Sequence, residues 1–345
     1  GTGNALTVKG NNRAGNIAGF QKLTFNLGNL NRTNPMLRLT SGTATNITFG
    51  SIAFEGTPEP KVGQITLVEK SAPSIHVADY AGVRGRTEGD FEYDLDTDTQ
   101  TANAKKILFD GYRFRNAVVT GAASGTDTWA GRSRIGNSTV NNRLTITGGS
   151  TTNAYGGWTA GTGTTAPAAQ QNNTKDNTAT LNAGTITNLY GGYTDAAAGK
   201  ATGNKVFVNG GSVTANVTGG FGGTDATDNH VTVTGGSVGG TIRGAQSAGT
   251  AHKNTVEIKG GNVHAGILGA DAAGAATENK VTTTGTVTGN ITGAKSTSGA
   301  VTKNVVTIKG NVTGNVIGGQ TTGAANANTV DLGAVTINGS VTGGA

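Results

Sequence analysis

The residues that could perform chemistry are sparse in this sequence and follow no catalytic spacing. The histidines, His76, His230, His252 and His264, are scattered, so no HxH or HExxH motif predicts a zinc site. The chain has no cysteine, which excludes a disulfide scaffold, a thiolate metal site and a cysteine nucleophile. It has no GxSxG motif, and its glycine-rich turns lack the Lys and Ser/Thr of a phosphate loop. We expect no metal and no cofactor.

Paired carboxylates are the remaining catalytic option, because β-helical enzymes generally attack polysaccharides with two or three neighbouring acids. Asp225 and Asp228 fall in one loop of the repeat described below, and Asp271 and Glu278 follow about two repeats later. These acids could approach a common face, but no pair among them is compelling. We therefore expect a protein that is not an enzyme, with a polysaccharide-degrading enzyme as the least favoured reading.

Every second residue from Asp90 to Asp98 is acidic in the segment DFEYDLDTD. Several carboxylates on one edge can bind calcium. On a flat strand, however, alternating acids diverge, and Arg84, Arg86, Arg113 and Arg115 alternate in the same way on flanking segments. This pattern favours an antiparallel meander that pairs acid with base, and calcium stays open as an alternative.

Aromatic residues at one position of successive repeats form a candidate binding surface. Trp158, Tyr193 and Phe221 follow the second glycine pair of their repeats, and Tyr155 and Tyr190 lie beside them. An exposed row of rings can stack on sugars or on a partner protein. The favoured alternative is that the rings cover the edge of the fold and pack on each other. The same position then holds, in order, Gln246, Asp271, Lys295 and Gln320.

A repeat of about 25 residues must position these side chains, and it runs from about residue 137 to 345. Its pattern is NxVxV, a glycine pair, VxxxV and a second glycine pair. Apolar residues recur at even spacing, as at Val206 and Val208, which is the period of a strand, and the many Gly and Thr residues disfavour a helix. The copies, of which the last six are 24 or 25 residues apart, begin at Asn142, Asn177, Asn204, Asn229, Asn254, Asn279, Asn304 and Asn328.

Short strands separated by glycine turns predict one polygonal coil per repeat. Stacking the coils at about 4.8 Å pairs each strand with the equivalent strand of the next coil, and the inward-facing valines then form a continuous core. The sequence therefore predicts an all-β, right-handed parallel β-helix, a solenoid with about 25-residue coils and an irregular antiparallel β insertion. We expect irregular coils over 1–60, the antiparallel meander over 61–135 and regular coils over 136–345.

Stacking also predicts which residues meet along the solenoid. The asparagines from Asn204 to Asn328 should form a column whose amides hydrogen-bond from coil to coil. The preceding residues, Asp228, Lys253, Glu278 and Lys303, alternate in sign, so neighbours should attract by about 0.2–1 kcal/mol per pair. We interpret both columns as structural ladders rather than as ligand sites.

Composition excludes several classes of protein. The 59 glycines follow no three-residue period and come with only 5 prolines, which excludes collagen. The net charge is +6, but the basic residues are not clustered, so no nucleic-acid partner is expected. No run approaches the roughly 18 apolar residues of a membrane span, so we expect no membrane insertion by this segment.

Several segments of the chain, in their order and combination, resemble the passenger regions of large autotransporter (type V secreted) adhesins of anaerobic Gram-negative bacteria. The similar segments are the NKVFVNGGSVTANVTGG repeats, the block from GNALTVKG to MLRLTSG, and YRFRNAVVTGAASGTDTWAGRSRIGNSTVNNRLTITGGS. The resemblance implies a stalk on the bacterial surface or outside the cell, used in adhesion and aggregation, with no catalytic residue to carry over. Complete members add a signal peptide and a terminal β-barrel, so we expect a fragment, a processed passenger or a protein that shares only the architecture.

These observations predict a non-enzymatic β-helical stalk that mediates adhesion or aggregation through multivalent contacts. Its expected partners are glycans or proteins of host or bacterial surfaces. The alternative is an extracellular filament built by head-to-tail stacking of open β-helix ends, because exposed strand edges can pair with another copy.

Overall fold

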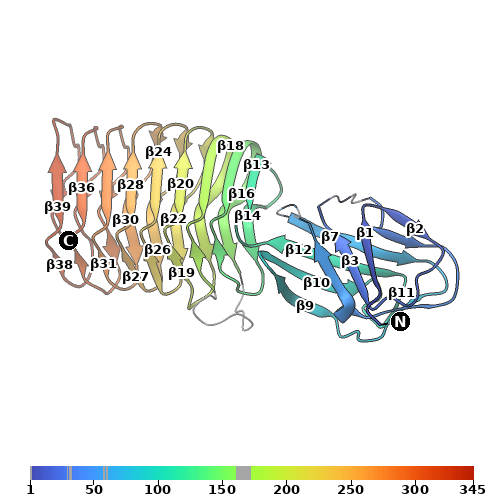
Figure 1. The fold of residues 1–345 in the computed structure, drawn as a ribbon. Helices are drawn as coiled ribbons and strands as arrows, with labels where there is room; N and C mark the ends of the chain where they lie inside the picture. The colour runs from blue at the N-terminus through green and yellow to red at the C-terminus, as the bar shows by residue number, and fades with distance from the viewer. Residues whose placement is uncertain (1, 29, 31–32, 57–58, 60, 161–171) are drawn as a thin grey trace. The chain divides into compact units, whose positions relative to one another are not determined.

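The computed structural model describes residues 2–28, 30, 33–56, 59, 61–160 and 172–345, and these form two compact units, Gly1–Arg113 and Phe114–Ala345. The described residues are predominantly strands and turns (Figure 1), and their only helix is a short 3₁₀ turn, η1 (Phe49–Ser51). The all-β solenoid with coils of about 25 residues is thus confirmed.

The three coils from Lys205 to Thr277 each contain four short strands where the repeat pattern suggested two. One coil consists of β20 (Lys205–Val208), β21 (Ser212–Val213), β22 (Val217–Gly222) and β23 (Asp225–Thr227). Every strand pairs in parallel with its equivalent one coil on, as β20 does with β24 (His230–Val233). The glycines and asparagines between the strands provide the corners that close each coil.

The other strands of the second unit continue these rows (Figure 1). They are β13 (Val118–Ala123), β14 (Asp127–Ser133), β15 (Thr139–Val140), β16 (Arg143–Thr159), β17 (Thr174–Lys175), β18 (Thr178–Thr194), β19 (Lys200–Thr202), β25 (Ser237–Val238), β26 (Ile242–Ser247), β27 (Thr250–His252), β28 (Thr255–Ile258), β29 (Asn262–Val263), β30 (Ile267–Ala272), β31 (Ala276–Thr277), β32 (Lys280–Thr283), β33 (Ile291–Thr292), β34 (Lys295–Ser296), β35 (Val301–Thr302), β36 (Val305–Ile308), β37 (Val316–Ile317), β38 (Ala325–Asn326), β39 (Thr329–Leu332) and β40 (Val341–Thr342).

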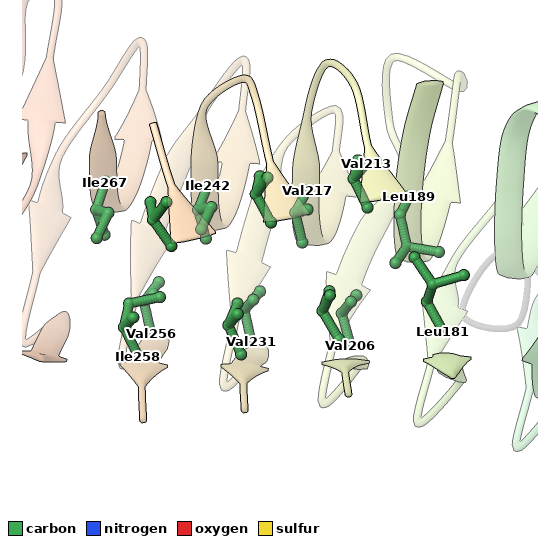
Figure 2. Packing of buried hydrophobic residues seen from close by; sticks show 14 of the residues in the cluster. Leu181, Leu189, Val206, Val213, Val217, Val231, Ile242, Val256, Ile258 and Ile267 are labelled. Atoms are coloured by element: carbon green, nitrogen blue, oxygen red, sulfur yellow. The ribbon is translucent and has the colours of Figure 1, made fainter. Parts of the chain in front are cut away.

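The core of the second unit is a continuous column of aliphatic side chains inside the coils. Val206 lies in register with Val231, and Val231 with Val256, so equivalent side chains meet one coil apart (Figure 2). Val213 and Val217 face them from the other side of the coil and are fully buried (Figure 2). Burying each such side chain contributes about 1.5–3 kcal/mol, which makes this repeated core the main source of stability.

The repeated asparagines form a buried ladder along one corner of the coils. From Asn142 to Asn328, each side-chain Nδ2 donates to the Oδ1 of the next asparagine at 2.7–3.0 Å. The second glycine pair packs against this ladder, because a Cβ on Gly157 would lie 2.4 Å from the side chain of Asn177. The same close approach holds for Gly220, so the glycines are required by packing as well as by turning.

The column with alternating charges does not form the predicted contacts. Asp228, Lys253, Glu278 and Lys303 occupy left-handed corners with φ between 55° and 58°, and all four are exposed. Within the described residues, no ion pair of 4.0 Å or less joins one of them to the next. These corners point the side chains into solvent, where the charged groups remain hydrated.

The first unit combines parallel coils with an antiparallel meander. β7 belongs to both, because it pairs in parallel with β4 and antiparallel with β12, and β10 joins β12 to β9 in the same antiparallel sheet. The strands are β1 (Ala5–Lys9), β2 (Asn12–Ala14), β3 (Lys22–Asn26), β4 (Leu37–Leu39), β5 (Thr45–Ile47), β6 (Ile52–Glu55), β7 (Lys61–Lys70), β8 (Ile75–Val77), β9 (Val83–Glu88), β10 (Phe91–Thr97), β11 (Asn103–Ala104) and β12 (Lys106–Arg113).

The predicted domain limits need correction on two points. Residue 60 is no boundary, because β7 continues the parallel sheet into the meander and buried residues of both parts, such as Phe25 and Phe109, share one core. The meander ends at Arg113 rather than at 135. β13 and β14 instead pair in parallel with β16, so they belong to the regular coils.

Candidate functional site

The aromatic residues lie on one outer face of the coils, where β14, β16, β18 and β22 run side by side. Trp158 is in register with Tyr193, and Tyr193 with Phe221, while Tyr155 pairs with Tyr190 in the neighbouring column. The structure therefore brings all five predicted aromatic residues together. The first column continues in the predicted order through Gln246, Asp271, Lys295 and Gln320.

The rings stack on each other along the columns. The ring centroids of Tyr193 and Phe221 are 4.7 Å apart, those of Tyr155 and Trp158 are 4.9 Å apart, and those of Tyr155 and Tyr190 are 5.3 Å apart. Stacking covers much of the ring faces, and only 6% of the surface of Tyr155 is exposed. Tyr155 is thus a packing residue, whereas Trp158, Tyr190, Tyr193 and Phe221 stay half-buried at the surface.

Two residues of this face were missed by the sequence analysis. Trp129 and Arg132 of β14 lie in register with Tyr155 and Trp158. The Arg132 guanidinium carbon lies 4.2 Å from the ring centroid of Trp158 and 4.8 Å from that of Trp129. The segment DTWAGRS matches NAYGGWT one coil later, but it fell within the range assigned to the meander.

Burial shifts the pKa values of three phenols on this face. It raises the pKa values of Tyr155, Tyr190 and Tyr193 above the ordinary value of 10.0. For Tyr155 the nearby carboxylate of Asp127 adds to this effect. The hydroxyls therefore act as neutral hydrogen-bonding groups in the physiological pH range.

A second asparagine ladder, also missed from the sequence, borders the rings. Asn153 Nδ2 donates to Asp127 Oδ1 at 2.9 Å, and Asn188 Nδ2 donates to Asn153 Oδ1 at 3.1 Å. Asn216 Nδ2 donates to Asn188 Oδ1 at 3.3 Å, and the Arg243 guanidinium donates to Asn216 Oδ1 at 3.2 Å. We call Asn153, Asn188 and Asn216 the outer ladder, and all three are half-buried.

The acids considered for catalysis do not form a pair. Asp271 is bound by Arg243 at 3.3 Å, while Glu278 and Asp228 occupy exposed corners. Asp225 lies on another face, 3.5 Å from His252. Among the described residues, no group of three or more histidines and acids is placed to hold a metal ion.

Two acids of strand β10 form ion pairs with an arginine of β9. Arg84 pairs with Asp94 at 3.5 Å and with Asp96. Asp98 Oδ1 accepts hydrogen bonds from the backbone N–H groups of Lys105 and Lys106, at 3.0 and 3.1 Å, so it closes a turn.

The other three predicted arginines do not lie directly opposite an acid of β10. In the register of the sheet, Arg86 lies opposite Tyr93 and Arg113 lies opposite Phe91. Arg115 belongs to the second unit, where its guanidinium lies over the ring of Phe114.

Comparisons with protein-family models, with curated proteins and with solved structures found no match. The described residues contain no helix of the length and hydrophobicity that a membrane span requires.

Proposed function

We propose that this chain is a non-enzymatic binding stalk that mediates adhesion or aggregation at a bacterial surface or in the extracellular space. The observation that carries the proposal is the outer face of β14, β16, β18 and β22. There the coils repeat half-buried rings and amides in register. Each contact is weak, but a rigid row presents several at once. After the first contact forms, the others meet the partner at a high effective concentration, so the overall affinity exceeds that of any single contact.

The resemblance to autotransporter passenger regions supports the same proposal, because those proteins look like surface stalks of stacked coils. The expected partners are glycans or proteins of host or bacterial surfaces. Asp271 and Asp225 are paired with Arg243 and His252 in different sheets of the coils. This argues against glycan cleavage, because that chemistry needs two acids on either side of the scissile bond.

Particles coated with the chain test the proposal. We expect them to attach to epithelial or bacterial cells, or to clump, while particles coated with the heat-unfolded chain do neither. Electron microscopy of the dilute chain should show single rods, and long fibres would favour the filament. Release of reducing sugars from common polysaccharides, together with failure to attach, would favour the enzyme.

A further inference from the structure

The two asparagine ladders of the second unit differ in how fully their amides are used. In the buried ladder, Asn204 Nδ2 donates both to Asn229 Oδ1 and to the backbone oxygen of Thr174, each at 3.0 Å. Asn229, Asn254, Asn279 and Asn304 repeat this double donation. Both amide hydrogens are used, so this ladder has no donor left for a ligand.

The outer ladder uses one amide hydrogen per residue. Among the described residues, Asn153 Nδ2 donates only to Asp127, Asn188 Nδ2 only to Asn153, and Asn216 Nδ2 only to Asn188. An amide nitrogen carries two hydrogens, so each residue keeps one N–H for solvent or a ligand. The three N–H groups are repeated from coil to coil at about 4.8 Å.

The charged groups around the outer ladder already have partners on the protein. Arg243 binds Asp271 and also the Oδ1 of Asn216. The Asp127 carboxylate accepts from Asn153, and the rings of Trp129 and Trp158 lie against the Arg132 guanidinium. A ligand with a strong charge of either sign would compete with these partners, so the face suits a neutral ligand rich in hydrogen-bonding groups.

A row that repeats along an axis suits a ligand that repeats along its own length. A neutral polysaccharide has this property, because each sugar unit presents hydroxyls that accept from an amide N–H and donate to its oxygen. The half-buried rings of Tyr190, Tyr193 and Phe221 flank the row and can cover the apolar C–H surface of a sugar.

We propose that the outer ladder, bordered by these rings, is a binding track for a neutral polysaccharide that lies along the solenoid axis. This inference rests on the proposed function, because it names the ligand class of the same face. It assigns recognition to Asn153, Asn188 and Asn216, with the rings as its border.

Electrophoresis of the full chain through gels that contain dextran, galactomannan, hydroxyethyl cellulose or mixed-linkage β-glucan tests the proposal. We expect at least one of these neutral polymers to retard the chain, and the variant N153A/N188A/N216A to lose about 10-fold or more in affinity. N188D keeps the shape of the side chain but removes its donor, so it should bind more weakly even if the triple variant unfolds. The matched control is N182A/N209A, which removes another coil-to-coil amide pair at an exposed corner and should bind like the wild type.

Three results would overturn the proposal. They are unchanged retardation of folded N153A/N188A/N216A or N188D, an equal loss in N182A/N209A, and no retardation of the wild type by any neutral polymer. If coated particles still attach to cells in the last case, the polysaccharide track is refuted while the binding stalk stands. If the particles also fail to attach, both proposals fall.

Discussion

Asn204 Nδ2 donates a hydrogen bond to Oδ1 of Asn229, 3.0 Å away, although 25 residues separate them in the sequence. The bond defines the length of one coil. Asn142 and Asn177 make the same contact at 2.7 Å across 35 residues, so the ladder keeps its geometry when a coil is longer. The ladder therefore sets the register that aligns every outward column, including the proposed binding face.

Substitution of a ladder residue should destabilise the second unit strongly. In Asn254→Ala, the backbone N–H and side chain of Asn229 lose their acceptor, and the oxygen of Ala226 loses its donor. Since these groups are buried, we expect a loss of about 2–4 kcal/mol in the free energy of unfolding, measured by urea denaturation. The exposed Asn209→Ala should change it by less than about 0.5 kcal/mol. Equal losses in the two variants would show that the ladder does not define the coils.

Glycine at a charged corner should stabilise the fold. Glu278 has φ of 58°, a conformation that costs an ordinary side chain about 1 kcal/mol and glycine very little. We expect Glu278→Gly to raise the unfolding free energy by about 0.5–1 kcal/mol, whereas Glu278→Ala leaves the strain in place. Lys280→Gly, in strand β32, should lower stability instead. A loss of stability in Glu278→Gly would contradict the structural role assigned to this column.

The buried lysine of the first unit should be important for its stability. Lys70 is fully buried, and its Nζ donates to the oxygen of Ser41 at 2.6 Å and to Asn16 Oδ1 at 3.3 Å. We expect Lys70→Ala to cost about 2–4 kcal/mol through the cavity and the unpaired acceptors, and Lys70→Met to cost less. Hydrogen exchange should show lost protection in residues 1–113 alone. Wild-type protection in both variants would disprove the role of this lysine.

High pH should weaken the second unit through its tyrosines. Burial raises the pKa values of Tyr190 and Tyr193 above 10.0, the value expected in the unfolded chain. When a group has a higher pKa in the folded chain than in the unfolded chain, its contribution to stability is complete below the pKa of the unfolded chain. That contribution is lost as the pH rises through the pKa of the folded chain. The unfolding free energy should therefore stay constant up to about pH 10 and fall above it. Phenolate absorbance should appear at a higher pH in the folded chain than in the unfolded chain. Tyr190→Phe/Tyr193→Phe should reduce this fall, and an unchanged pH dependence would contradict the burial of these phenols.

The sequence predicts the regular coils well because in-register stacking converts a spacing of 25 residues into contact between neighbours. That rule is sufficient to place Trp158 beside Tyr193 and Asn204 beside Asn229. It fails in the meander, where a register shift between Tyr93 and Leu95 decides which residues face each other. A single sequence does not specify such a shift, because its pattern allows more than one pairing.

The proposed binding face was predicted only in part for the same reason. The aromatic columns follow the repeat, but the N–H groups that the outer ladder keeps available depend on the hydrogen bonds between its side chains. Arg243, which ends that ladder, stands where the preceding coil has Thr218, so no periodic signal identified it.

The central claim is that adhesion arises from many weak contacts along one face. It is tested most directly by the flow force that detaches chain-coated particles from a cell surface. For wild type and for N153A, N188A, N216A and the triple variant, the account predicts a small, similar loss of force in each single variant. It predicts a loss in the triple variant that is much greater than any of these. A single substitution that abolishes attachment while the other two have no effect would indicate one binding pocket and contradict the claim.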